Sequence, residues 1–125
     1  MSAEDVERRL PLWCALSELF LDTELQPADF DRVAAVLARA GVSADEARGI
    51  LENEVAPVFI PNTLSVAGEW AGWREDFVRE RIVAHLRSGS GRRAWSALQA
   101  RVHMDLYESA WAEVADRLNR VGPPR

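Results

Sequence analysis

The sequence predicts an all-α fold, a compact single-domain bundle of about five to six helices. Apolar residues recur at spacings of three and four along most of the chain, and no segment alternates as a strand would. The 125 residues, 48% hydrophobic and 28% charged, suit one core. We therefore expect one domain over residues 1–121 and a frayed tail over residues 122–125, which read Gly-Pro-Pro-Arg.

The first helix is expected to begin at Ser2, which resembles a capping box with Asp5. Pro11 lies inside the helical pattern and removes one backbone donor. The pattern keeps its phase across Pro11, so a kinked continuous helix is favoured over a helix that begins at Pro11. The residues that share one face are Val6, Leu10, Trp13, Leu16 or Ser17, and Phe20.

Residues that are typical of helix ends predict two further helices. Pro27 suits a first helical position, and Gly41 supplies the C-terminal stop of that second helix. Ser43 and Glu46 form a capping box that begins the third helix. Pro57, followed by a second proline four residues later, is expected to end it.

The middle of the chain is the least regular part of the sequence. Residues 57–72 show no sustained periodicity: residues 58–60 are too few to distinguish a strand from a buried turn, and residues 65–72 are expected to form a loop or a short helix. A fourth helix follows over residues 74–87, and residues 88–91, Ser-Gly-Ser-Gly, form a flexible joint.

The C-terminal part is expected to contain two helices that break near His103–Asp105. At 100° per residue, two groups of apolar residues point in directions that differ by roughly 140°. Asp105 and Glu108 also match a capping box for the second of these helices. The two groups are Trp95, Leu98 and Val102, then Tyr107, Trp111, Val114 and Leu118.

The charge distribution disfavours nucleic acid as a partner. The net charge is −5, made of −8 over residues 1–86 and +3 over residues 87–125. An acidic body repels phosphate groups. The same charge suits solubility or, alternatively, docking on a protein with a basic surface.

The sequence also predicts a cytoplasmic protein that does not enter the membrane. No apolar run approaches the roughly 18 residues of a spanning helix. The acidic first residues lead into no apolar segment of a secretory signal. Cys14, the single cysteine, cannot form an internal disulfide.

No motif for metal, cofactor or nucleophilic catalysis is found, so no metal and no cofactor are expected. Cys14 has no neighbouring histidine and is interpreted as packing. His85 is expected to be a half-buried histidine, and His103 to lie at a helix end. An anion at the helix that follows Gly89–Gly91, beside Arg92 and Arg93, is an alternative to a plain linker there.

Carboxylates and tryptophans are the remaining candidates for a site. Acidic residues such as Asp22, Glu24 and Glu69, with Glu52 and Glu54, can hold a divalent ion or act as an acid–base pair, or else form a solvated face. Three of the five tryptophans, Trp13, Trp95 and Trp111, are expected in the core. Trp70 and Trp73 either pin the irregular segment or form an exposed binding anchor.

Three stretches carry a family resemblance: residues 13–25 (WCALSELFLDTEL), 54–58 (EVAPV) and 64–72 (LSVAGEWAG). They resemble a family of small bacterial proteins known only as a domain of unknown function, and the likeness covers about residues 8–87. The resemblance implies a bacterial origin and marks the motif positions Asp22, Glu24, Asn62, Glu69 and Trp70. A structural alternative is that Asp22 and Thr23 cap helices and Asn62 closes a turn.

These features favour a protein-binding module, in particular an immunity-type or regulatory inhibitor of a bacterial toxin or enzyme. Its acidic side chains would pair with a basic partner. The candidate binding residues are Asp22, Glu24, Asn62, Glu69, Trp70 and Trp73. One alternative is a self-associating or adaptor protein with a dimer face of Trp111, Val114 and Leu118. Another is a carboxylate-site enzyme, with or without a metal.

Overall fold

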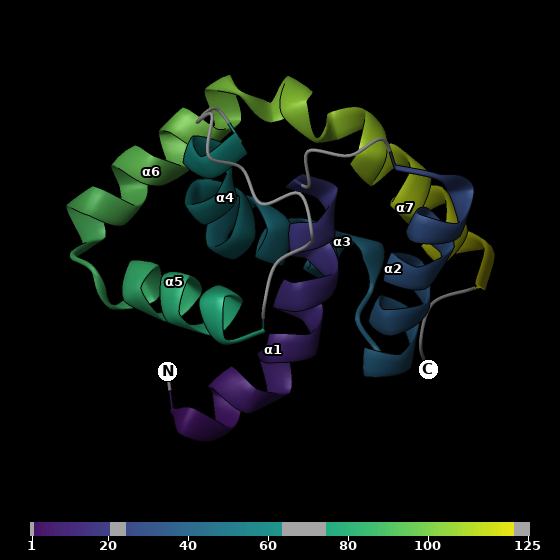
Figure 1. Ribbon diagram of the computed structural model, residues 1–125, viewed down its shortest axis with the longest axis horizontal. Helices are drawn as coiled ribbons and strands as arrows, with labels where there is room; N and C mark the ends of the chain where they lie inside the picture. Colours follow the sequence, from purple (N-terminus) through teal and green to yellow (C-terminus); the bar gives the residue numbers. More distant parts are fainter. Residues whose placement is uncertain (1, 21–24, 64–74, 122–125) are drawn as a thin grey trace.

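The computed structural model is built of helices, and no strand occurs in the residues that it describes (Figure 1). Those residues are 2–20, 25–63 and 75–121, and within them the side chains of residues 61–63, 106 and 121 are not described. The predicted all-α fold is therefore confirmed.

Helix α1 (Ala3–Ser17) runs through Pro11 without a break, as its periodicity predicts, and ends in the short turn η1 (Glu18–Phe20). The predicted capping box is present, because the Ser2 hydroxyl accepts from the Asp5 N–H at 3.2 Å and the Asp5 carboxylate accepts from the Ser2 N–H. The face of α1 that carries Trp13 is buried against the rest of the chain.

Helix α2 (Pro27–Ala40) begins at a proline and ends at Gly41, which has a φ of 77°. This left-handed conformation favours glycine, so the predicted stop is confirmed. Helix α2 packs against α7 (Glu108–Val121), and Figure 1 shows the two helices together at one side of the molecule.

The apolar face of α7 is part of the core. Trp111, Val114 and Leu118 are only 6%, 0% and 3% exposed. Helix α2, rather than a second copy, lies against α7. The predicted dimer face of these three residues is therefore wrong.

The third helix does not end at Pro57. Helix α3 (Ala44–Ile50) begins at the predicted Ser43–Glu46 capping box and passes through a wider turn, η2 (Leu51–Val55), into α4 (Ala56–Thr63). In η2 the Ala56 N–H bonds to the Leu51 carbonyl, five residues back, which defines a π-helical turn. With this continuous helix counted as one, the described residues form six main helices, within the predicted number.

A remote hydrogen bond compensates for Pro57 inside this helix. Proline has no N–H, so it cannot donate to Asn53, four residues earlier. The Asn53 carbonyl instead accepts from His85 Nε2 at 3.1 Å. His85 belongs to α5 (Glu75–Arg87), so this bond also ties α5 to the π-turn.

The C-terminal part breaks where the two apolar directions predict. Helix α6 (Ser90–Val102) ends at His103, and the turn η3 (Met104–Leu106) leads into α7. Asp105 lies within η3, so the predicted Asp105–Glu108 capping box does not form. The Glu108 carboxylate instead accepts two bonds from the Arg48 guanidinium, at 2.9 and 3.1 Å.

Helix α6 turns its large apolar side chains outward. Trp95, Leu98 and Val102 are 60%, 52% and 70% exposed, so the expectation that Trp95 belongs to the core is wrong. Helix α6 packs against α4. Its buried and half-buried positions are occupied by small residues, namely Ser96, Ala97 and Ala100.

Trp95 and Trp111 both lie on apolar helix faces, but we predict that their substitution by alanine changes the free energy of unfolding by very different amounts. Trp111→Ala should lower the free energy of unfolding by about 3–5 kcal/mol, because it opens a cavity in the core. Trp95→Ala should change it by less than about 1 kcal/mol, because the side chain is mostly exposed. Urea unfolding of both variants measures the difference. Equal losses would show that Trp95 also packs in the core.

Candidate functional site

Most residues of the site predicted from sequence lie outside the described part of the chain. Asn62 is in the last turn of α4, and its side chain is not described. Whether the acidic and aromatic residues converge stays a prediction. The residues outside the described ranges are Asp22, Glu24, Glu69, Trp70 and Trp73.

The acidic residues of the π-turn are engaged in structural contacts. Glu54 accepts a hydrogen bond from Trp13 Nε1 at 2.7 Å and an ion pair from Arg9, and its side chain is only 13% exposed. Glu52 pairs with Arg48. Among the described residues, no three His, Cys, Asp or Glu side chains lie close enough to hold a metal ion.

The Cys14 thiol is poorly suited to act as a nucleophile. Burial, together with the nearby carboxylates of Glu75 and Glu18, raises its pKa to about 11. A thiol with this pKa is protonated at neutral pH, whereas the thiolate is the reactive form. Cys14 instead packs against the core as a half-buried side chain.

His85 is the half-buried histidine that the sequence predicts. Burial lowers its pKa, and its Nε2–H donates to the Asn53 carbonyl. The neutral ring then keeps the Nδ1 lone pair as an acceptor. His103 lies at the C-terminal cap of α6, as expected.

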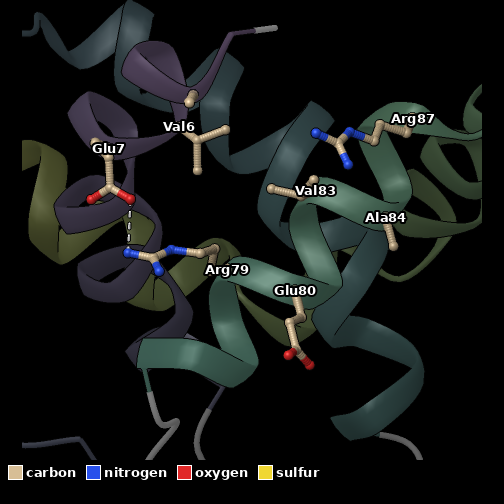
Figure 2. Close-up of a pocket in the computed structure, with 8 residues that line it drawn as sticks. Val6, Glu7, Arg79, Glu80, Val83, Ala84 and Arg87 are labelled. Carbon is tan, nitrogen blue, oxygen red and sulfur yellow. Dashed lines mark ion pairs between the residues drawn. The ribbon is translucent and has the colours of Figure 1, made fainter.

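A cavity of about 440 Å³ lies between α1 and α5 (Figure 2). Figure 2 shows Arg79 reaching from α5 toward α1, where its guanidinium pairs with Glu7 at 2.9 Å. Among the described lining residues, two are acidic and two are basic, so their charges balance and favour neither an anion nor a cation. Its lining residues are Ala3, Val6, Glu7, Arg79, Glu80, Val83, Ala84 and Arg87.

A second cavity, of about 370 Å³, lies between α4, α5 and α6, and we call it the basic pocket. Two arginines line it, Arg81 from α5 and Arg92 from α6, and none of its lining residues in the described ranges is acidic. The guanidinium of Arg81 stacks over the Phe77 ring at 5.1 Å. The remaining lining residues are Pro57, Val58, Ala84, His85, Ser88 and Ser96.

The third candidate is the exposed face of α6, which we call the α6 apolar surface. It consists of Trp95, Leu98 and Val102, with the neighbouring Met104 at 37% exposure. Figure 1 shows α6 along the outer edge of the molecule. No helix in the described ranges is long and apolar enough to cross a membrane.

The α6 apolar surface is bordered by basic residues. Arg92, Arg93 and Arg101 are exposed on α6, and residues 87–104 contain four arginines and no acidic residue. Arg93 donates to the Leu86 carbonyl at 3.1 Å. In the part of the chain that the structure describes, Arg92 and Arg101 form no salt bridge.

Sequence reasoning missed the α6 apolar surface, and it raised an anion beside Arg92 only as an alternative, without Arg81 or the other walls of the basic pocket. The charge run over residues 87–104 was a visible signal, because basic residues without acidic partners mark a surface that is free to pair with another molecule. The small residues on the face of α6 opposite Trp95 were a second signal. They allow close helix contact without any need to bury Trp95.

The chain belongs to a family described as "Domain of unknown function (DUF7079)", whose model matches residues 7–117. This confirms the resemblance to a domain of unknown function. The match extends beyond the first 87 residues and includes α6 and most of α7. No curated protein and no solved structure matches the sequence.

We predict that His85 makes stability depend on pH. Because burial lowers its pKa in the fold, the neutral form contributes stability above about pH 6.5, and this stability is lost as the pH falls toward the folded pKa. The free energy of unfolding of His85→Gln should therefore fall less than that of the wild type between about pH 7.5 and 5.5. Denaturant unfolding at several pH values measures this.

His103→Gln is the matched control, since it removes the other histidine, and it should keep the wild-type slope. An unchanged slope in His85→Gln would contradict the assignment of this pH dependence to the buried His85 ring.

Proposed function

We propose that this protein is a protein-binding module and that the α6 apolar surface is its contact face. The observation that carries the proposal is the 60% exposure of Trp95 beside the exposed Leu98 and Val102. A buried tryptophan removes 150–250 Å² of surface from water, which is worth several kcal/mol. The fold leaves most of this free energy unused, so it is available to a partner.

The composition of this surface supports a protein partner. Tryptophan, methionine and arginine are enriched in protein interfaces, and tryptophan and arginine dominate their binding energy. The surface combines Trp95 and Met104 with the exposed Arg92 and Arg101. It sits on a regular helix, so the side chains are held in place before binding, which reduces the ordering cost.

The charge of this face favours an acidic partner with an apolar patch. Arg92 and Arg101 are exposed on α6 and form no salt bridge among the described residues, so they attract carboxylates at the rim of an interface. They also repel a second copy of the same face. We therefore favour a different protein over self-association through α6.

The acidic partner proposed here differs from the basic partner that the composition of the sequence favours. An immunity-type or regulatory inhibitor would place acidic side chains on a basic toxin or enzyme. That proposal rests on Asp22, Glu24 and Glu69, which lie outside the described residues. The described surface favours the reverse arrangement, in which this protein supplies the arginines.

We further propose that the protein acts in a reducing compartment, the bacterial cytoplasm. The support is the single cysteine, Cys14, which is free and half-buried, together with the resemblance to small bacterial proteins.

We predict that one acidic protein binds the wild type, and that substitutions in the α6 apolar surface weaken this binding. Tagged protein is expressed in the source organism, crosslinked mildly and recovered, and the partner is identified by mass spectrometry and purified. Trp95→Ser should weaken its binding at least about 30-fold, because truncating a central anchor typically costs 2 kcal/mol or more. Arg101→Glu should weaken binding and slow association.

Arg39→Glu, on the exposed side of α2, is the matched control for charge and should bind like the wild type. A partner whose affinity is unchanged by Trp95→Ser would rule out the α6 apolar surface as the contact face. A partner with a basic contact surface would overturn the proposed chemistry in favour of contact through Asp22, Glu24 and Glu69.

A further inference from the structure

We propose that the basic pocket binds the phosphate group of a small phosphomonoester. The pocket shares Arg92 with the border of the α6 apolar surface, but Arg81, His85 and Ser88 line the pocket alone, and Trp95 and Leu98 are not among its lining residues. The proposal therefore does not depend on the proposed function.

The charge of the pocket matches a phosphomonoester. Arg81 and Arg92 supply two positive charges, and among the residues that the structure describes no acidic side chain lines the pocket. A phosphomonoester carries a charge of about −1.5 to −2 at pH 7. Guanidinium groups bind such oxyanions through paired hydrogen bonds, which single ammonium groups cannot form.

Further donors surround the same space. Ser88 and Ser96 place hydroxyl groups in the lining. Helix α6 begins between Ser88 and Arg92, and no side chain caps its first N–H groups. The unpaired N–H groups of a helix N-terminus carry a partial positive charge that attracts anions.

The sequence offers an anion beside Arg92 and Arg93 as an alternative to a plain linker, and the structure changes the residues that would hold it. Arg93 is turned back to the Leu86 carbonyl at the end of α5, so it does not line the pocket. Arg81, which is distant in sequence, takes its place. The stacking of Arg81 over Phe77 holds the guanidinium without neutralising its charge.

The size and walls of the pocket favour a small organic ligand over a bare ion. A volume of about 370 Å³ is far larger than one water molecule and lies in the range of small-molecule sites. Pro57, Val58 and Ala84 give it an apolar wall from α4 and α5. This wall suits the carbon part of the ester, while the arginines hold the phosphate.

The test is a titration of ¹⁵N-labelled protein with phenyl phosphate and with inorganic phosphate, at constant ionic strength set by sodium chloride. We expect saturable shifts of the amide signals around Ser88–Arg92, and tighter binding of phenyl phosphate than of inorganic phosphate. Arg81→Gln and Arg92→Gln should each weaken binding about tenfold or more, because each removes charge-assisted hydrogen bonds. Arg92→Lys should retain part of the affinity.

Arg101→Gln and Trp95→Ser are the controls, since both change exposed α6 residues outside the pocket, and both should bind phenyl phosphate like the wild type. Unfolding midpoints of all variants establish that they fold. The proposal is overturned if no saturable shift appears up to about 50 mM ligand. It is also overturned if the folded Arg81→Gln and Arg92→Gln variants bind as tightly as the wild type.

Discussion

The half-buried carboxylate of Glu54 is the interaction on which the arrangement of the N-terminal helices depends. Trp13 is fully buried, so its indole N–H needs an acceptor inside the protein. Glu54 supplies that acceptor, and Arg9 balances its charge. Since Trp13 and Arg9 belong to α1, these contacts join α1 to the π-turn. The adjacent residue, Asn53, binds His85 and so joins α5 to the same turn.

The position of α6 depends on these contacts of α1 and α5 with the π-turn. Helix α4 continues from the π-turn, and α6 packs against it through small side chains. Close contact through small residues leaves the large apolar residues of α6 on the outside. It also leaves Arg81 and Arg92 facing a shared cavity between α4, α5 and α6. One packing arrangement therefore produces both surfaces that we propose to be functional.

The parts of the fold that depend on local chemistry were predictable from the sequence. The capping box at Ser43 and the left-handed Gly41 involve residues a few positions apart, so their spacing is sufficient. Continuation of the helix through Pro57 was not predictable, because the compensating donor, His85, is 28 residues away in sequence. Periodicity also placed Trp95 and Trp111 on apolar faces, but it carries no information on which face another helix covers. Asp22, Glu24, Glu69, Trp70 and Trp73 lie outside the described residues, so their convergence stays a prediction. The arginines of α6 were visible in the sequence, but the basic pocket was not, because only the fold brings Arg81 of α5 beside Arg92 of α6.

Hydroxyl-radical footprinting of tryptophan oxidation tests the central claim, that α6 presents a large apolar surface to a partner. The account predicts rapid oxidation of Trp95 in the isolated protein, strong protection of Trp95 when the acidic partner is added, and slow oxidation of Trp13 and Trp111 in both states. Slow oxidation of Trp95 in the isolated protein would show that the fold covers this surface itself. Equal oxidation of Trp95 with and without the partner would show that binding occurs elsewhere, and either result would contradict the account.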